Sequence, residues 1–126
     1  MIDYDRWPSF TAKELQCQHC GKDNPNPEFI ELMDDVQDLR NKLGFPFPIT
    51  SGYRCPDHPL EVNKESLGQH SIAAVDIGVS YHKAEELLGA AYASGKFNGK
   101  GVNQKGSANK RFIHLDNREH KALWSY

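Results

Sequence analysis

The segment Ile72 to Val79 most constrains the fold, because it places one acidic residue inside an otherwise small and apolar run. A short apolar run of this length, bounded by polar residues, is typical of an interior β-strand. A carboxylate in a buried strand is costly unless something cationic pairs with it. We therefore expect Asp76 to be a ligand for a cation rather than an isolated acid.

Two histidines are the natural companions of this carboxylate. His70 precedes Asp76 in the pattern HxxxxxD, and His114 lies between apolar neighbours in FIHLD. FIHLD is a second predicted strand, and because side chains alternate along a strand, His114 and Asp116 share one face. Two imidazoles and a carboxylate are the ligand set of a zinc ion whose fourth position stays open. The sequence therefore predicts that His70, Asp76 and His114 meet at one metal ion.

The other elements follow from local signals. Thr11 and Glu14 have the spacing of a capping box. Asn26 precedes a helix that starts at Pro27, carries one apolar stripe and stops at Gly44. We also expect a strand over 49–54, a helix over 81–94 capped by Ser80, turns over 97–109 around Gly101, and strands over 111–116 and 121–126.

Together these elements predict one α+β domain over residues 1–126, with helices packed on a small antiparallel sheet. The length of 126 residues fits one domain. A formal net charge of −2 gives no general attraction to nucleic acid or membranes. We expect a monomer without membrane insertion. The opening MIDYDRWPSF lacks a basic region and an apolar core, so we expect synthesis in the cytoplasm without a signal peptide.

The three cysteines leave two interpretations open. Cys17 and Cys20 form a CxxC pair, and Cys55 stands alone. An odd count argues against an oxidised disulfide framework. The thiols, with His58, are either a second, structural zinc site or reduced and partly buried side chains.

Several segments resemble one known family in the right order. They are FTAKELQCQHCGK (10–22), ITSGYRCPDHP (49–59), GQHSIAAVDIGV (68–79), FIHLD (112–116) and DNREHKALWSY (116–126). The chain resembles the zinc peptidases that include D-Ala-D-Ala carboxypeptidases and murein endopeptidases, which have the hedgehog/DD-peptidase fold. It is most similar to the small phage and prophage members of that family.

The resemblance implies a role for each matched residue. His70, Asp76 and His114 would bind one catalytic zinc ion. Arg54 would direct its guanidinium group at a carbonyl oxygen or a carboxylate of the substrate. The expected substrate-binding residues come from the same segments: Ser51, Tyr53, Arg54 and Gln69.

The activity implied is hydrolysis of a peptide bond in the peptidoglycan stem peptide or cross-bridge by a phage or prophage lysin. Such an enzyme reaches the cell wall after release through a membrane pore or as part of a virion. One alternative is an inactive zinc-binding structural or virion component of the same fold. A second is a small zinc-ribbon-like binding module built on Cys17 and Cys20.

The sequence departs from the family pattern in its first metal motif. The gap from His70 to Asp76 is one residue shorter than usual, Gly68 replaces a serine, and Ala73 replaces a glycine. A shift of one residue along a strand moves a side chain to the opposite face. The loop after His70 must therefore absorb the difference if Asp76 is to reach the metal.

The second departure concerns the general base. Relatives place an acid or a histidine just before the last ligand, where this chain has Lys110, Arg111 and Ile113. We expect Asp116 to be either the base or a partner that supports His114. His58 and Glu65 are alternatives for the base.

Overall fold

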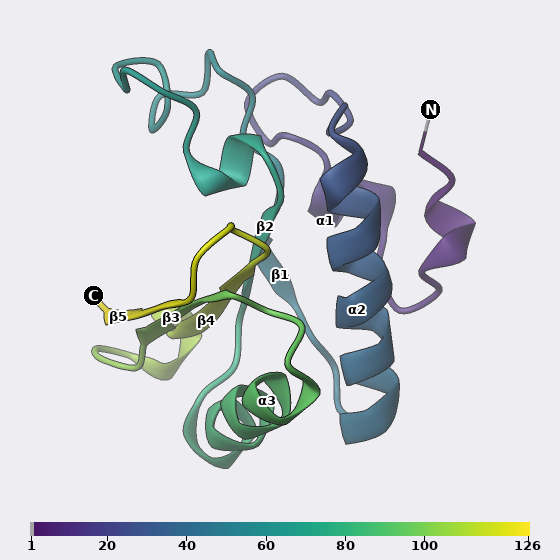
Figure 1. Cartoon of the computed structure of the whole chain (residues 1–126), viewed down its shortest axis with the longest axis vertical. Helices are drawn as coiled ribbons and strands as arrows, with labels where there is room; N and C mark the ends of the chain where they lie inside the picture. The colour runs from purple at the N-terminus through teal and green to yellow at the C-terminus, as the bar shows by residue number, and fades with distance from the viewer. Residues whose placement is uncertain (1) are drawn as a thin grey trace.

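The computed structural model describes residues 2–126. Within this range the helices and strands alternate irregularly along the chain, and α2 and α3 pack against a five-stranded sheet, as Figure 1 shows. The elements are α1 (Ala12–Leu15), α2 (Pro27–Leu43), β1 (Ile49–Ser51), β2 (Ala74–Ile77), α3 (Tyr81–Ser94), β3 (Gly99–Asn103), β4 (Phe112–Asp116) and β5 (Ala122–Ser125). The α+β class is therefore confirmed, and the sheet excludes the alternative of a module built on the cysteines alone.

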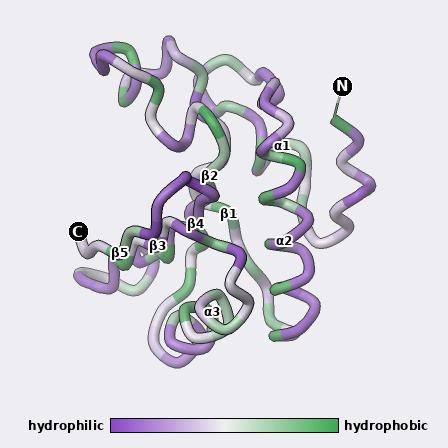
Figure 2. The backbone as a smooth tube through the Cα atoms, in the orientation of Figure 1, coloured by the Kyte–Doolittle hydropathy of each residue, from purple (hydrophilic) through white to green (hydrophobic). Residues whose placement is uncertain are grey.

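The sheet has the strand order β1-β2-β4-β3-β5, and the expectation of a purely antiparallel sheet is wrong at one edge. The strand β5 runs parallel to β3, whereas the other pairs are antiparallel. A short hydrophilic turn after β4 reverses the chain (Figure 2). Since β2 and β3 already occupy both sides of β4, the reversed strand joins the far edge of β3.

Local signals place the helices as predicted. The Thr11 hydroxyl accepts a hydrogen bond from the Glu14 backbone N–H at 3.2 Å, and the Glu14 carboxylate accepts one from the Thr11 N–H at 3.0 Å. α2 ends at Gly44, whose φ of 75° suits a residue without a side chain. Asn26 and Ser80 precede α2 and α3, but neither side chain caps its helix.

The two faces of the sheet differ in character. One face packs into the apolar core beneath α2 and α3, and its central residues Val75, Ile77, Ile113 and Leu115 are at most 1% exposed. The opposite face carries Asp76 and the polar residues of β4. In the described part of the chain, no helix combines the length and apolar character needed to cross a membrane.

The predicted turn region over 97–109 is wrong in its first half, because β3 spans Gly99–Asn103. The glycines that suggested turns instead pair with β4: Gly99 lies opposite Asp116 and Gly101 opposite His114. A strand with no side chains at these positions leaves room above it for the side chains of its neighbours.

Candidate metal centre

The centre is built on one row of residues that crosses the whole sheet. Asp76 on β2 lies directly opposite His114 on β4. Directly opposed residues of an antiparallel pair point to the same face, with Cβ atoms about 5 Å apart. From β1 to β5 the row reads Ser51, Asp76, His114, Gly101 and Trp124.

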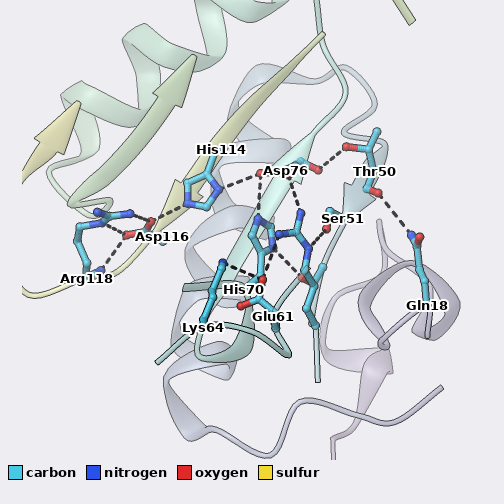
Figure 3. A network of polar contacts seen from close by, with 12 residues as sticks. Gln18, Thr50, Ser51, Glu61, Lys64, His70, Asp76, His114, Asp116 and Arg118 are labelled. Atoms are coloured by element: carbon cyan, nitrogen blue, oxygen red, sulfur yellow. Dashed lines mark hydrogen bonds and ion pairs between the residues drawn. The ribbon is translucent and has the colours of Figure 1, made fainter. Parts of the chain in front are cut away.

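The three predicted ligands converge on this row. The Asp76 Oδ1 atom lies 3.2 Å from His70 Nε2 and 2.9 Å from His114 Nδ1. One donor atom from each of the three residues lies within 4.8 Å of the others, and all three residues are buried. Figure 3 shows both imidazoles directed at the Asp76 carboxylate.

The backbone between His70 and Asp76 absorbs the shortened gap. His70 lies in a 3₁₀ helix, Gln69–Ser71, and Ile72 follows with φ −111° and ψ −78°. Regular β2 begins only at Ala74, later than the predicted start. The irregular residues between the helix and the strand let Asp76 face the imidazoles despite the missing residue.

The outer nitrogen of each imidazole has its own partner. His70 Nδ1 lies 2.8 Å from the carbonyl oxygen of Gly52, and His114 Nε2 lies 2.6 Å from Asp116 Oδ2. Ligand histidines in metal sites are generally held in this way, since the outer hydrogen bond fixes the tautomer and the ring orientation. Each ring therefore keeps its inner nitrogen directed at Asp76.

Asp116 lies behind His114 rather than in front of it. Its side chain is fully buried, and its oxygens accept hydrogen bonds from the Arg118 side chain at 2.9 and 2.7 Å. Burial raises the pKa of Asp116, but the hydrogen bonds with His114 and Arg118 hold it well below its usual range. This placement favours support of His114 over the role of base, the two functions that the sequence left open for Asp116.

The electrostatics of the centre favour a cation. Burial raises the pKa of Asp76, but hydrogen bonds with His114 and His70 lower it to about 2. Burial lowers the pKa of His114, yet the carboxylates of Asp116 and Asp76 raise it overall. Two ionised carboxylates therefore enclose one imidazole. A zinc ion matches this donor set of two nitrogens and one carboxylate oxygen and balances its charge.

Arg54 borders the centre on the β1 side. Its guanidinium lies 3.9 Å from Asp76 Oδ2 and 3.5 Å from Glu61 Oε2, and its Nε donates to the Ser51 hydroxyl at 3.2 Å. The Glu61 side chain is only 2% exposed and also pairs with Lys64 at 3.0 Å. Sequence reasoning missed Glu61, since a single acid in a polar loop carries no distinguishing pattern.

The other predicted residues lie in different surroundings. Tyr53 is buried against Cys17 and Cys55, so its side chain packs in the cysteine cluster instead of lining an open surface. Gln69 is half-buried in the 3₁₀ helix beside His70. Glu65 is exposed, and the His58 ring lies 6.0 Å from the ring of His19.

An aromatic side chain that sequence reasoning did not single out completes the row. The rings of Trp124 and His114 have centroids 5.1 Å apart, and Tyr126 lies 6.4 Å beyond Trp124. The alternation of Trp124 and Tyr126 in the last strand was a signal that both lie on one face. The centre is therefore bordered by Arg54 on one side and by aromatic rings on the other.

The comparison with known proteins places this geometry in a family. No curated protein matches the chain. The sequence profile described as Peptidase M15 matches residues 8–116, which include Arg54 and all three residues of the centre. This match covers most of the sequence, and the chain therefore belongs to the peptidase M15 family.

Proposed function

We propose that the protein is a zinc-dependent peptidase that hydrolyses a peptide bond in the peptidoglycan stem peptide or cross-bridge. The observation that carries this proposal is the convergence of His70, Asp76 and His114, with donor atoms within 4.8 Å of one another, in a chain of the peptidase M15 family. When bound, a zinc ion supplies Lewis acidity, which polarises a carbonyl group and lowers the pKa of water to about 7.

The residues around the centre have separate roles in holding the metal ion. His70 and His114 present fixed nitrogens, because Gly52 and Asp116 hold their outer atoms. Asp116 supports His114 and does not itself take up a proton, since Arg118 and His114 occupy its oxygens. A supported ligand set keeps its geometry as charge develops in the substrate.

Arg54 is the group that meets the substrate. Its side chain is 19% exposed, whereas those of Asp76 and Glu61 beneath it are 7% and 2% exposed. The guanidinium therefore reaches the surface while two carboxylates fix its position. From there it stabilises an oxyanion or binds a terminal carboxylate in bidentate fashion.

Aromatic side chains form the wall of the proposed binding surface that lies across the centre from Arg54. Trp124 contacts His114, and the rings of Phe112 and Tyr126 lie 5.0 Å apart next to it. We expect a short peptide with small apolar side chains and a free carboxylate to bind between these rings and Arg54. Ser51 and Gln69, at the Arg54 side, supply hydrogen bonds to its backbone.

The decisive experiment is digestion of purified peptidoglycan with and without a chelator, with products identified by mass. We expect muropeptide cleavage that stops on chelation, returns with zinc and is absent in His114→Ala. His82→Ala, which changes an exposed histidine on α3, should cleave normally. Cleavage that is indifferent to chelation contradicts the proposal.

A second function is supported by one feature of the sequence. Lys110 and Arg111 occupy the region before His114 where relatives carry an acid or a histidine. This favours an inactive zinc-binding structural or virion component. Purified protein that contains zinc but releases no muropeptide would decide for the inactive component.

If the protein is an active peptidase, we propose that it is a monomeric phage or prophage lysin. It would meet the cell wall after release or within a virion.

A further inference from the structure

A second group of metal-binding side chains lies apart from the sheet row. One sulfur atom each from Cys17, Cys20 and Cys55 lies within 4.8 Å of the others. Cys17 is 1% exposed and Cys55 is 5% exposed, whereas Cys20 reaches the surface. All three thiols are free, so no disulfide explains their proximity.

The backbone around the CxxC pair forms a tight turn that presents both sulfurs to one side. The Gly21 N–H donates to the Cys17 carbonyl at 2.7 Å, and the Cys17 N–H donates to the carbonyl of Lys22 at 3.0 Å. Gly21 has φ 74°, which a residue without Cβ adopts without strain. The Cys55 N–H donates to the Cys17 sulfur at 3.3 Å, and such a donor favours the thiolate that metals bind.

Ordinary apolar packing explains only part of this arrangement. Cys17, Cys55 and Tyr53 form a small buried cluster separate from the main core. Burial accounts for two of the thiols, but not for the more exposed Cys20, which still lies within reach of both. Three converging thiols supply three of the four ligands of a tetrahedral structural zinc site.

We propose that Cys17, Cys20 and Cys55 bind a second, structural zinc ion, with a fourth position filled by an imidazole or by water. The ion would join the turn after α1 to the segment after β1. Both of these parts of the chain lie outside the helices and strands. The thiols bind it as thiolates, and each releases its proton to solvent on binding.

The second site would also hold the first. Between the two lies the segment Gly52 to Cys55, in which the Gly52 carbonyl contacts His70 Nδ1 and the Arg54 N–H donates to the His70 carbonyl at 2.9 Å. A metal fixed at Cys55 therefore restrains both a partner of His70 and the backbone of Arg54. This consequence rests on the proposed function, whereas the existence of the second site does not.

The test counts metal ions without measuring activity. Protein purified with zinc in reducing buffer is analysed by elemental analysis and by native mass spectrometry. We expect two zinc ions per chain in the wild type, one in Cys20→Ser, one in His70→Ala and none in the double variant. His82→Ala serves as the control and should keep two.

Cobalt substitution identifies the ligands and does not depend on how the cysteine variant folds. Cobalt bound to thiolates gives an intense near-ultraviolet charge-transfer band, so His70→Ala, which retains all three cysteines, should show this band at one equivalent. A His70→Ala protein without the band overturns the second site, and so does a wild type with a single zinc ion that Cys20→Ser leaves in place. If the wild type binds one zinc ion and still cleaves peptidoglycan, the second site is refuted and the proposed function stands.

Discussion

At the residue scale, the central feature is the imidazole of His114, which lies between two carboxylates. Asp76 lies at its inner nitrogen and Asp116 at its outer one. The outer carboxylate is in turn fixed by Arg118, whose guanidinium carbon lies 4.4 Å from the Trp124 ring. A chain of contacts therefore runs from Trp124 on the last strand through Arg118 and Asp116 to His114.

The first prediction concerns this outer contact. Asp116→Asn keeps the size of the side chain but removes the charge that orients His114 and raises its basicity. We expect zinc affinity to fall about 10- to 100-fold, as is usual when such a supporting partner is lost. Competition with a chromogenic chelator measures the affinity, and circular dichroism checks the fold. A folded variant with wild-type affinity would show that Asp116 does not support the site.

The second prediction separates substrate binding from metal binding. Arg54→Ala should lower kcat on a stem peptide about 10²- to 10³-fold, the usual cost of losing one group that stabilises the oxyanion. The zinc content should stay unchanged, because Glu61 remains paired with Lys64. Arg111→Ala, which removes an arginine that stacks on Tyr81 away from the centre, is the matched control. Equal losses in both variants would argue against the role of Arg54.

One departure from the family pattern, Gly68, lies beside the paired side chains of Glu61 and Lys64. A Cβ atom on Gly68 would lie 2.5 Å from Glu61 Oε1 and 2.8 Å from Lys64 Nζ. A serine, usual at this position, would require the flexible ends of Glu61 and Lys64 to shift. Sequence reasoning predicted that His70, Asp76 and His114 meet, but it did not predict this pair, because spatial proximity across a polar loop leaves no periodic pattern.

At the scale of elements, a helix or strand can be predicted when the residues that determine it lie within its own segment. α2 follows from its apolar stripe, its first proline and its terminal glycine, all of which are local. β3 was missed because Gly99 and Gly101 suggest turns when read alone. Their role is set by the neighbouring strands: Cβ atoms there would lie 2.0 Å from Asp116 Oδ1 and 2.7 Å from Trp124.

The third prediction tests this role of the glycines. Gly99→Ala should displace the Asp116 carboxylate, lower the stability by about 1–3 kcal/mol through overpacking and weaken zinc binding. Gly89 on α3 has open space around it, so Gly89→Ala should stabilise by up to about 1 kcal/mol. Denaturant unfolding and zinc titration measure both effects. Wild-type zinc affinity in Gly99→Ala would show that the carboxylate tolerates the added methyl group.

The fourth prediction compares two helix starts. Thr11 makes its capping bond to Glu14, whereas Ser80 makes no side-chain cap to α3. Thr11→Ala should therefore lower the free energy of unfolding by about 1 kcal/mol, while Ser80→Ala should have a smaller effect. Urea unfolding of the two variants side by side measures the difference. The expected order would be contradicted if Ser80→Ala were the more destabilised protein.

At the scale of the molecule, the centre depends on pairing between distant segments. His70 and Asp76 are close in sequence, but His114 reaches them only because β4 lies beside β2. The sequence predicted which residues meet from their chemistry, and it could not predict the strand order or the parallel edge strand. These depend on which side of β4 is already occupied, a property of the assembled sheet.

The last prediction follows from this dependence on assembly. A metal that binds the folded chain more tightly than the unfolded chain stabilises it, by about 2.7 kcal/mol at a free concentration 100 times the Kd. Zinc should therefore raise the urea midpoint above that of chelated protein. Magnesium, which prefers oxygen ligands, should leave it unchanged. Because the apolar core under α2 and α3 contains no ligand, the chelated protein should still unfold cooperatively, at a lower midpoint. Equal midpoints with zinc and with chelator would mean that the folded chain binds zinc no more tightly than the unfolded chain.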